Sequence, residues 1–459
     1  MAYSRPNSRY RCSLLNRRLL CGLALIAGST LGGAQEPQGD AGPDAFDADV
    51  LDVEARTADG DLPELVARLE VELLLTELVD QARFEEAVPI AERMVELTEE
   101  ESGVSIELGI ALSNLAILQR SLELYEPSER NFVRAVDVIR EADGAYSEAA
   151  ISPLVGLGMN YQARGDYFEA ETTYEEARTV SRRAHGLLNE QQIDILDHLA
   201  STMMDMQRYV EADEYQLTAL HLMERIHGAD MPGVLPAIYK FARWLRSAYR
   251  FQEERGQYVR AMDIIRDYEG ATSQAMVRPL RETGISYRTQ KLPEGRGLSA
   301  LRRALEIAEN QPAPDTRLIA ETLVDIGDWN VAFSKVGATG EEYRRAWQLL
   351  GELADGDALR GEWFNDPIYV LRENPSSRGI GSPNDPGALP GHVLITFDVT
   401  EFGRTVNVTV VESVPPGLKD DSTARAIGRS RFRPRMVDGE LVRAPGLARN
   451  FTFHYQPEE

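Results

Sequence analysis

Large side chains recur along this chain at intervals of 41 or 42 residues, and this period constrains the fold more than any other feature. Each is expected to open the second helix of a helix pair; they are Phe84, Tyr125, Tyr167, Tyr209, Phe251 and Leu292. A fixed period of this length is typical of stacked helix pairs, in which each pair buries its apolar face against the next. We therefore predict a mainly α fold, with a helical repeat domain of about seven helix pairs over residues 63–354.

One repeat shows the pattern within a helix pair most clearly. Gly158 and Tyr161 lie in its expected first helix, and Ala170 and Ala177 lie in its second. This pattern resembles the tetratricopeptide repeat (TPR), and the long period resembles the kinesin-light-chain type of that family. In that family the small residue lets the first helix approach the second, the aromatic residue fills the gap, and the small alanines accept the neighbouring helix. The resemblance implies an α-solenoid whose inner face is lined mostly by the first helix of each pair, and such faces usually bind peptides or partner proteins.

The C-terminal part of the chain is patterned for strands. Val393, Ile395, Phe397 and Val399 alternate with more polar residues, and a second alternating stretch, 406–410, follows a short turn that contains Gly403. Two alternating runs joined by a glycine-containing turn predict a β-hairpin. A third run, 449–455, predicts a final strand.

Several single residues in this region form an ordered set. They are Gly391, Gly403, Asn407, Phe432-Arg433-Pro434, Asp438-Gly439 and Phe453, with a helix expected in the stretch 419–428. In this order they resemble the C-terminal domain of TonB-type energy transducers. The resemblance implies a small α+β domain over residues 391–459. In that family the final strand pairs with a short segment of an outer-membrane receptor, while a proton-driven motor in the inner membrane supplies energy through an anchor helix.

The resemblance also places the expected partner-binding site on the last strand. The residues carried over are Arg449, Asn450, Phe451, Thr452, Phe453, His454 and Tyr455. The aromatic face of this strand is expected to pack on the helix that contains Ala424 and Ile427. Its outer edge would then keep N–H and C=O groups unpaired, which is a template for an added strand.

The first 34 residues have the composition of an export signal. They carry five arginines and no acidic residue, and an apolar run of 13 residues, 19–31, precedes Gly32-Gly33-Ala34. This pattern predicts a signal peptide that is cleaved after Ala34, and hence a periplasmic protein. The run is shorter than the roughly 20 residues that span a bilayer. The alternative is an uncleaved anchor that holds the chain in the inner membrane, facing the periplasm.

Two segments between these parts lack a globular pattern. Residues 35–62 are rich in Asp, Gly and Pro, which predicts a disordered acidic tether. Residues 355–390 contain five prolines and several glycines, which predicts a linker. Within it, the apolar piece 368–371 either adds a strand to the terminal sheet or packs on the last helix.

Charge and motifs together favour protein partners and argue against catalysis. The net charge of −25 disfavours nucleic acid and anionic lipid surfaces, and both cysteines, Cys12 and Cys21, lie in the predicted signal. The six histidines show no metal-ligand spacing, and no catalytic or cofactor-binding motif is found. A cluster of arginines, Arg425, Arg429, Arg431, Arg433 and Arg435, is either a contact site for anions or a solvated surface.

These observations predict a non-enzymatic periplasmic adaptor without cofactor or metal. Its TonB-like domain would contact an envelope or outer-membrane transport partner by strand addition, and its TPR groove would bind other proteins or peptides. The alternative is a soluble periplasmic TPR scaffold with no role in energy transduction.

Overall fold

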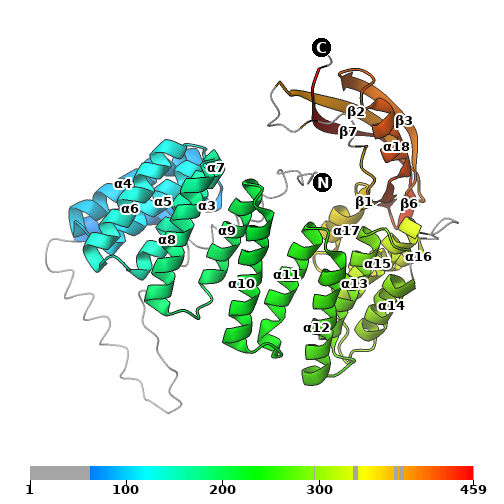
Figure 1. The fold of residues 1–459 in the computed structure, drawn as a ribbon, viewed down its shortest axis with the longest axis horizontal. Helices are drawn as coiled ribbons and strands as arrows, with labels where there is room; N and C mark the ends of the chain where they lie inside the picture. The colour runs from blue at the N-terminus through cyan, green and yellow to red at the C-terminus, as the bar shows by residue number, and fades with distance from the viewer. Residues whose placement is uncertain (1–61, 294, 334–339, 377–380, 382–386, 458–459) are drawn as a thin grey trace. The chain divides into compact units, whose positions relative to one another are not determined.

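The computed structural model describes residues 62–457, except 294, 334–339, 377–380 and 382–386. The predicted signal peptide, 1–34, and the tether up to residue 61 lie outside the described residues. The chain divides into two compact units, Met1–Ile226 and His227–Glu459, each of which is described by itself. Figure 1 labels their helices and strands.

The first unit consists of helix pairs. Its helices are α3 (Leu62–Asp80), α4 (Phe84–Ser102), α5 (Ile106–Ser121), α6 (Tyr125–Asp143), α7 (Ile151–Arg164), α8 (Tyr167–His185), α9 (Gln192–Asp205) and α10 (Tyr209–His227). Gly158 of α7 lies against the ring of Tyr174 in α8, where an added Cβ would come within 2.5 Å of a ring carbon. Ala170 and Ala177 are fully buried. The small residues therefore set how closely the two helices of a pair approach, as the sequence predicts.

The turns between helices repeat as regularly as the helices. The turn inside each of the first six pairs contains one residue with positive φ; these are Ala82, Glu123, Gly165, Gln207, Tyr249 and Lys291. A glycine with positive φ follows the second helix of each of the first five pairs: Gly103, Gly144, Gly186, Gly228 and Gly270. Left-handed backbone at fixed positions ends each helix at the same place, which keeps the repeats in register.

A pair of glycine substitutions tests this backbone requirement. Gly165 has φ +95°, whereas Gly256 lies exposed within a helix and has nothing within 4 Å of an added Cβ. Gly165→Ala should cost about 1 kcal/mol because an L side chain disfavours left-handed backbone. Gly256→Ala should instead stabilise by about 0.5–1 kcal/mol. Urea unfolding measures both, and shifts of the same sign would contradict the assigned backbone.

The second unit continues the helix pairs. Its helices are α11 (Leu235–Ser247), α12 (Phe251–Glu269), α13 (Val277–Thr289), α14 (Gly295–Glu309), α15 (Thr316–Phe333) and α16 (Glu341–Leu350), followed by a shorter α17 (Gly356–Phe364). Together, α3 to α16 make seven helix pairs in the described part of the chain. This confirms the predicted mainly α fold with about seven pairs.

A small α+β module, which we call the terminal module, ends the chain. Its strands and helix are β2 (Leu389–Val399), β3 (Thr405–Val414), α18 (Asp420–Arg429), β4 (Arg431–Arg433), β5 (Arg435–Val437), β6 (Glu440–Val442) and β7 (Ala444–Tyr455). One three-stranded antiparallel sheet has the order β3-β2-β7, and β5 pairs with β6. The alternating residues Val393, Ile395, Phe397 and Val399 are buried, and the last three form a core with Ile427 and Phe432.

The range predicted as a linker contains regular structure. Besides α17, it holds β1 (Ile368–Leu371), which pairs antiparallel with β4. The side chains of Phe364, Val370 in β1 and Met436 in β5 are buried in one core with Tyr343 and Leu350 of α16. The apolar piece 368–371 thus packs against repeat helices, and it pairs with β4 in a separate two-stranded sheet rather than joining the sheet β3-β2-β7.

Candidate functional site

The strand predicted to bind a partner lies at the edge of the terminal sheet. β2 is the central strand, and β7 and β3 flank it. β7 therefore has one edge paired with β2 and one edge that no described strand covers along its length. An uncovered edge offers N–H and C=O groups to an added strand.

One proline determines which residues of β7 point their backbone N–H and C=O groups toward β2 and which point them away. Pro390 in β2 is paired with His454 in β7, and because proline has no N–H this pair cannot exchange hydrogen bonds. Pairs alternate along an antiparallel ladder, so the N–H and C=O groups of Asn450, Thr452 and His454 point away from β2. Those of Phe451 and its odd-numbered neighbours point toward β2.

A hydrogen bond on the outer edge agrees with this phase. The N–H of Gly381 donates to the C=O of His454 over 2.8 Å, in an antiparallel bridge. Within the described residues, no hydrogen bond reaches the outward backbone groups of Asn450 or Thr452. In the part of the chain that the structure describes, the outer edge is thus occupied at His454 and open at the two preceding outward positions.

The two edges of the sheet differ in regularity. The pairing of β7 with β2 runs without a break over nine residue pairs, from Leu389–Tyr455 to Phe397–Leu447. The pairing of β3 with β2 is interrupted twice, and Asn407 in β3 has a positive φ. Bulges disrupt the ladder and discourage pairing at an edge. β7 is therefore the better template of the two.

The side chains of β7 alternate as the sequence predicts. Phe451 packs with Ala424 and Ile427 of α18, and the ring of Phe453 lies over Gly391. Asn450 and Thr452 are exposed. The remaining predicted residues also lie on this strand: Arg449 is exposed, whereas His454 and Tyr455 are half-buried. All seven residues predicted as a partner site thus lie together on one edge strand.

A buried ionic cluster holds the terminal module against the last helix pair. Arg433 of β4 donates from Nε and Nη2 to the two carboxylate oxygens of Asp328 in α15, each over 2.9 Å. The same carboxylate accepts from the Tyr343 hydroxyl over 2.8 Å and forms an ion pair with Arg288 of α13 at 2.7 Å. We call Asp328, Arg433, Arg288 and Tyr343 the junction cluster.

The neighbouring arginines keep the Asp328 carboxyl ionised in the folded protein. Burial alone would raise the pKa of this carboxyl, but the charges of Arg433 and Arg288 outweigh burial and hold the pKa below its usual range. Burial and the adjacent Asp328 charge raise the pKa of Tyr343, which therefore stays a hydrogen-bond donor. The cluster is structural, because each of its groups is engaged by another member.

The sequence did not reveal this cluster. In the sequence Arg433 is one of several neighbouring arginines, and Asp328 belongs to a helix whose neighbouring residues are mostly apolar. An aspartate among apolar residues on a helix is a signal for a buried ion pair. Its partner, more than a hundred residues away in the sequence, is not recognisable from local patterns.

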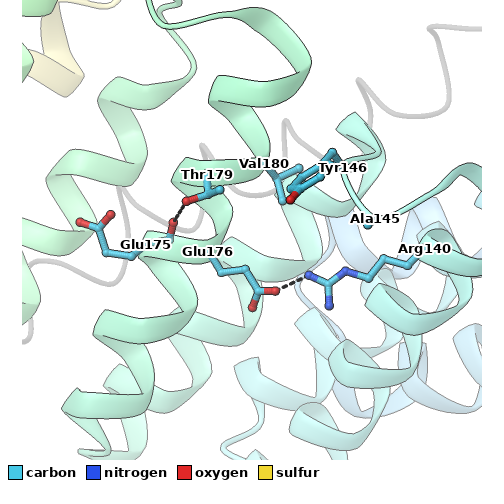
Figure 2. A pocket seen from close by; sticks show the side chains of 7 residues that line it. All are labelled: Arg140, Ala145, Tyr146, Glu175, Glu176, Thr179 and Val180. Atoms are coloured by element: carbon cyan, nitrogen blue, oxygen red, sulfur yellow. Dashed lines mark hydrogen bonds and ion pairs between the residues drawn. The ribbon is translucent and has the colours of Figure 1, made fainter.

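The repeat helices carry one further surface feature. An open hollow between α6 and α8 is crossed by an ion pair between Arg140 and Glu176 (Figure 2). It is lined by Arg140, Ala145, Tyr146, Glu175, Glu176, Thr179 and Val180. Over the described residues, no group of His, Cys, Asp or Glu side chains is arranged to hold a metal ion. The helices described here include none long and apolar enough to cross a membrane.

Two family models match the chain in the regions just described. Residues 388–455 match the model described as Gram-negative bacterial TonB protein C-terminal. Residues 154–190 and 193–232 match the model described as tetratricopeptide repeat. The chain therefore joins tetratricopeptide repeats to a C-terminal module of the TonB type, and both modules belong to families that bind proteins or peptides.

Two known proteins share these parts. The chain is 30% identical over 92 residues to Protein TonB of Pseudomonas aeruginosa. The aligned stretch covers 20% of this chain and 23% of that protein. It is 28% identical over 92 residues to Tetratricopeptide repeat protein 19 homolog, mitochondrial, of Drosophila melanogaster, over 19% of this chain and 25% of that protein. The chain thus spans about a quarter of the length of each of these relatives.

Two solved structures are similar to part of the chain. The crystal structure of BtubC (BKLC) from P. vanneervenii is similar at 20% identity and a TM-score of 0.38, over 50% of this chain and 94% of that one. A putative kinesin light chain of Podosopora anserina with nearly identical TPR-like repeats is similar at 14% identity and a TM-score of 0.35, over 44% and 96%.

Proposed function

We propose that this protein is an exported, non-enzymatic adaptor of the cell envelope. Its terminal module takes an extended segment of a transport partner, such as an outer-membrane receptor, as an additional strand along β7. Its helical repeats bind further proteins or peptides on the face formed by the first helix of each pair. The partner segment would gain backbone hydrogen bonds from the outer edge of the strand, and the exposed side chains of Asn450 and Thr452 would contribute selectivity.

The observation that carries this proposal is the contrast between the two sheet edges. β7 presents outward backbone groups at Asn450 and Thr452 on a ladder of nine unbroken pairs, whereas β3 is interrupted twice. The match of residues 388–455 to the TonB C-terminal model supports the same edge. A soluble periplasmic scaffold without energy transduction is the second candidate, favoured by the short apolar run in the predicted signal.

Single-cysteine cross-linking tests the binding edge directly. Cys12 and Cys21 are the two cysteines of the chain, so replacing both by Ser leaves a cysteine-free background. Thr452→Cys in β7 and Thr409→Cys in β3 place one exposed thiol on each edge strand. After labelling with a photo-activated maleimide in envelope preparations, a cross-linked partner is expected with Thr452→Cys and not with Thr409→Cys. A partner cross-linked only from β3, or from neither strand, would contradict binding at β7.

The export step gives a separate prediction. The purified protein is expected to begin at or near Gln35 and to be released with the periplasmic fraction, because 13 apolar residues are too few to span a bilayer. Intact-mass measurement checks the starting residue. A full-length chain that stays in the inner membrane after a salt wash would favour the anchored form.

A further inference from the structure

The terminal module is slightly basic in a strongly acidic chain. Residues 388–455 contain nine Arg and Lys and seven Asp and Glu, whereas the whole chain has a net charge of −25. A local reversal of charge marks a surface that attracts what the rest of the molecule repels. The sequence left open whether the arginines here contact an anion or simply face solvent.

The structure separates these arginines into two groups. Arg433 is buried in the junction cluster and has its carboxylate partner. Others gather where α18 ends and β3 and β4 begin. Arg404 and Arg431 face each other in an antiparallel bridge, and Arg431 Nη1 donates to the C=O of Arg429 over 3.1 Å. We call this group the basic corner; it consists of Arg404, Arg425, Arg429 and Arg431.

Like charges lie close together in the basic corner. Arg425 and Arg429 are exposed and four residues apart on α18, a spacing at which two like charges repel each other. Burial and then the charge of Arg404 lower the pKa of Arg431. The C-terminal end of α18 favours a cation at Arg429, and backbone carbonyls accept from Arg431.

No carboxylate of the described residues pairs with the exposed arginines of the basic corner. Asp398 is paired with Arg443, and Asp421, at the start of α18, lies four residues before Arg425 without forming an ion pair with it. Among the described residues, no ion pair joins a carboxylate to Arg425, Arg429 or Arg431. The guanidinium groups of Arg425 and Arg429 are therefore available to an external anion.

We propose that the basic corner is a second contact site of the terminal module and that it binds an acidic peptide segment of a partner protein. Planar guanidinium groups match carboxylates with paired hydrogen bonds. A short acidic segment is small enough to contact the basic corner alone and is attracted to it. An extended anionic membrane would also be repelled by the rest of the chain, whose net charge is −25. The site lies on the β3 side of the sheet and the candidate edge on the β7 side, so both can be occupied together.

Binding of a defined acidic peptide tests the proposal. The probe is a fluorescein-labelled peptide of alternating glutamate and serine, added to the full mature chain at low ionic strength and followed by anisotropy. Arg425→Glu with Arg429→Glu should weaken binding on the order of tenfold or more, since attraction at two positions becomes repulsion. The matched control is Arg296→Glu with Arg302→Glu, an equal charge change at exposed positions of α14, which should bind as the wild type does.

Each of the following results would overturn the proposal. One is equal weakening by both double variants, which would show that net charge alone matters. Another is equal binding of a peptide in which glutamine replaces glutamate, or no binding of the acidic peptide at all. The third is binding of anionic phosphatidylglycerol vesicles that depends on Arg425 and Arg429 while peptide binding does not, which would assign the corner to a membrane surface. Circular dichroism confirms that both double variants are folded.

Discussion

Asp328→Asn is expected to lower the free energy of unfolding of the C-terminal unit by about 3–5 kcal/mol. The substitution removes the negative charge that Arg433 and Arg288 share, and both guanidinium groups remain largely buried. Leaving a buried cation without its partner lowers the free energy of unfolding far more than losing an ion pair at the surface does. Because Arg433 belongs to the terminal module and Asp328 to the last helix pair, loss of the charge should also loosen the module from the repeats.

The matched control is an ion pair at the surface. Asp357 pairs with Arg360 at 3.2 Å, and its side chain is 97% exposed, so Asp357→Asn should change stability by no more than about 1 kcal/mol. Chemical denaturation followed by circular dichroism compares the two variants. A loss for Asp328→Asn no larger than that of the control would show that the junction cluster does not hold the module in place.

The same carboxylate makes stability depend on pH. The folded-state pKa of Asp328 lies below its unfolded value of about 3.9. Its contribution is therefore complete at neutral pH and is lost as the pH falls below about 4 and through the folded-state value. Asp328→Asn should flatten this part of the acid-unfolding curve, because the titrating group is absent.

Thr452→Pro is expected to weaken capture of the envelope partner on the order of tenfold or more while the terminal module stays folded. The N–H of Thr452 points outward, so proline removes a donor that only an added strand would use, and its ring crowds that strand. Pull-down from envelope extracts with the full chain measures capture, and circular dichroism measures folding.

The control for Thr452→Pro is a proline at a residue whose backbone N–H points toward β2 instead of outward. Arg449 is exposed like Thr452, but it is paired with Ile395 and its N–H points toward β2. Arg449→Pro should therefore destabilise the module by roughly 1–3 kcal/mol, through a lost hydrogen bond inside the sheet. If both variants fold and both capture the partner as the wild type does, β7 is not the binding edge, and the helical repeats become the better candidate.

The sequence predicted the repeats and the final strand because both depend on local patterns, whereas the edge position of that strand was implied by the resemblance to TonB-type domains. The 42-residue spacing shows directly in residues such as Tyr125 and Tyr167, and the alternation around Phe451 and Phe453 fixes the faces of β7. The hydrogen-bond phase was not predictable, because alternation of side chains does not say which pairs exchange hydrogen bonds. That information comes from Pro390 opposite His454.

The sequence also predicts a linker over residues 355–390, because the prolines and glycines of this segment are typical of connections between modules. The structure places α17 and β1 there and buries Val370 in the same core as Tyr343. Apolar residues in a short segment do not reveal which distant surface they cover. Long-range pairs such as Asp328 with Arg433 are hidden for the same reason.

The strand proposed to bind a partner and the strand fixed to the repeats are different strands of one module. β7 is held by β2 along nine consecutive pairs, whereas β4 is fastened to α15 through Arg433. A pull along a segment added to β7 would run parallel to the strands, so the hydrogen bonds of the ladder would share the load and would have to shear together. If a partner pulls on β7 as proposed, the force would leave the module through β4 into α15, and the terminal module would couple that pull mechanically to the helical repeats.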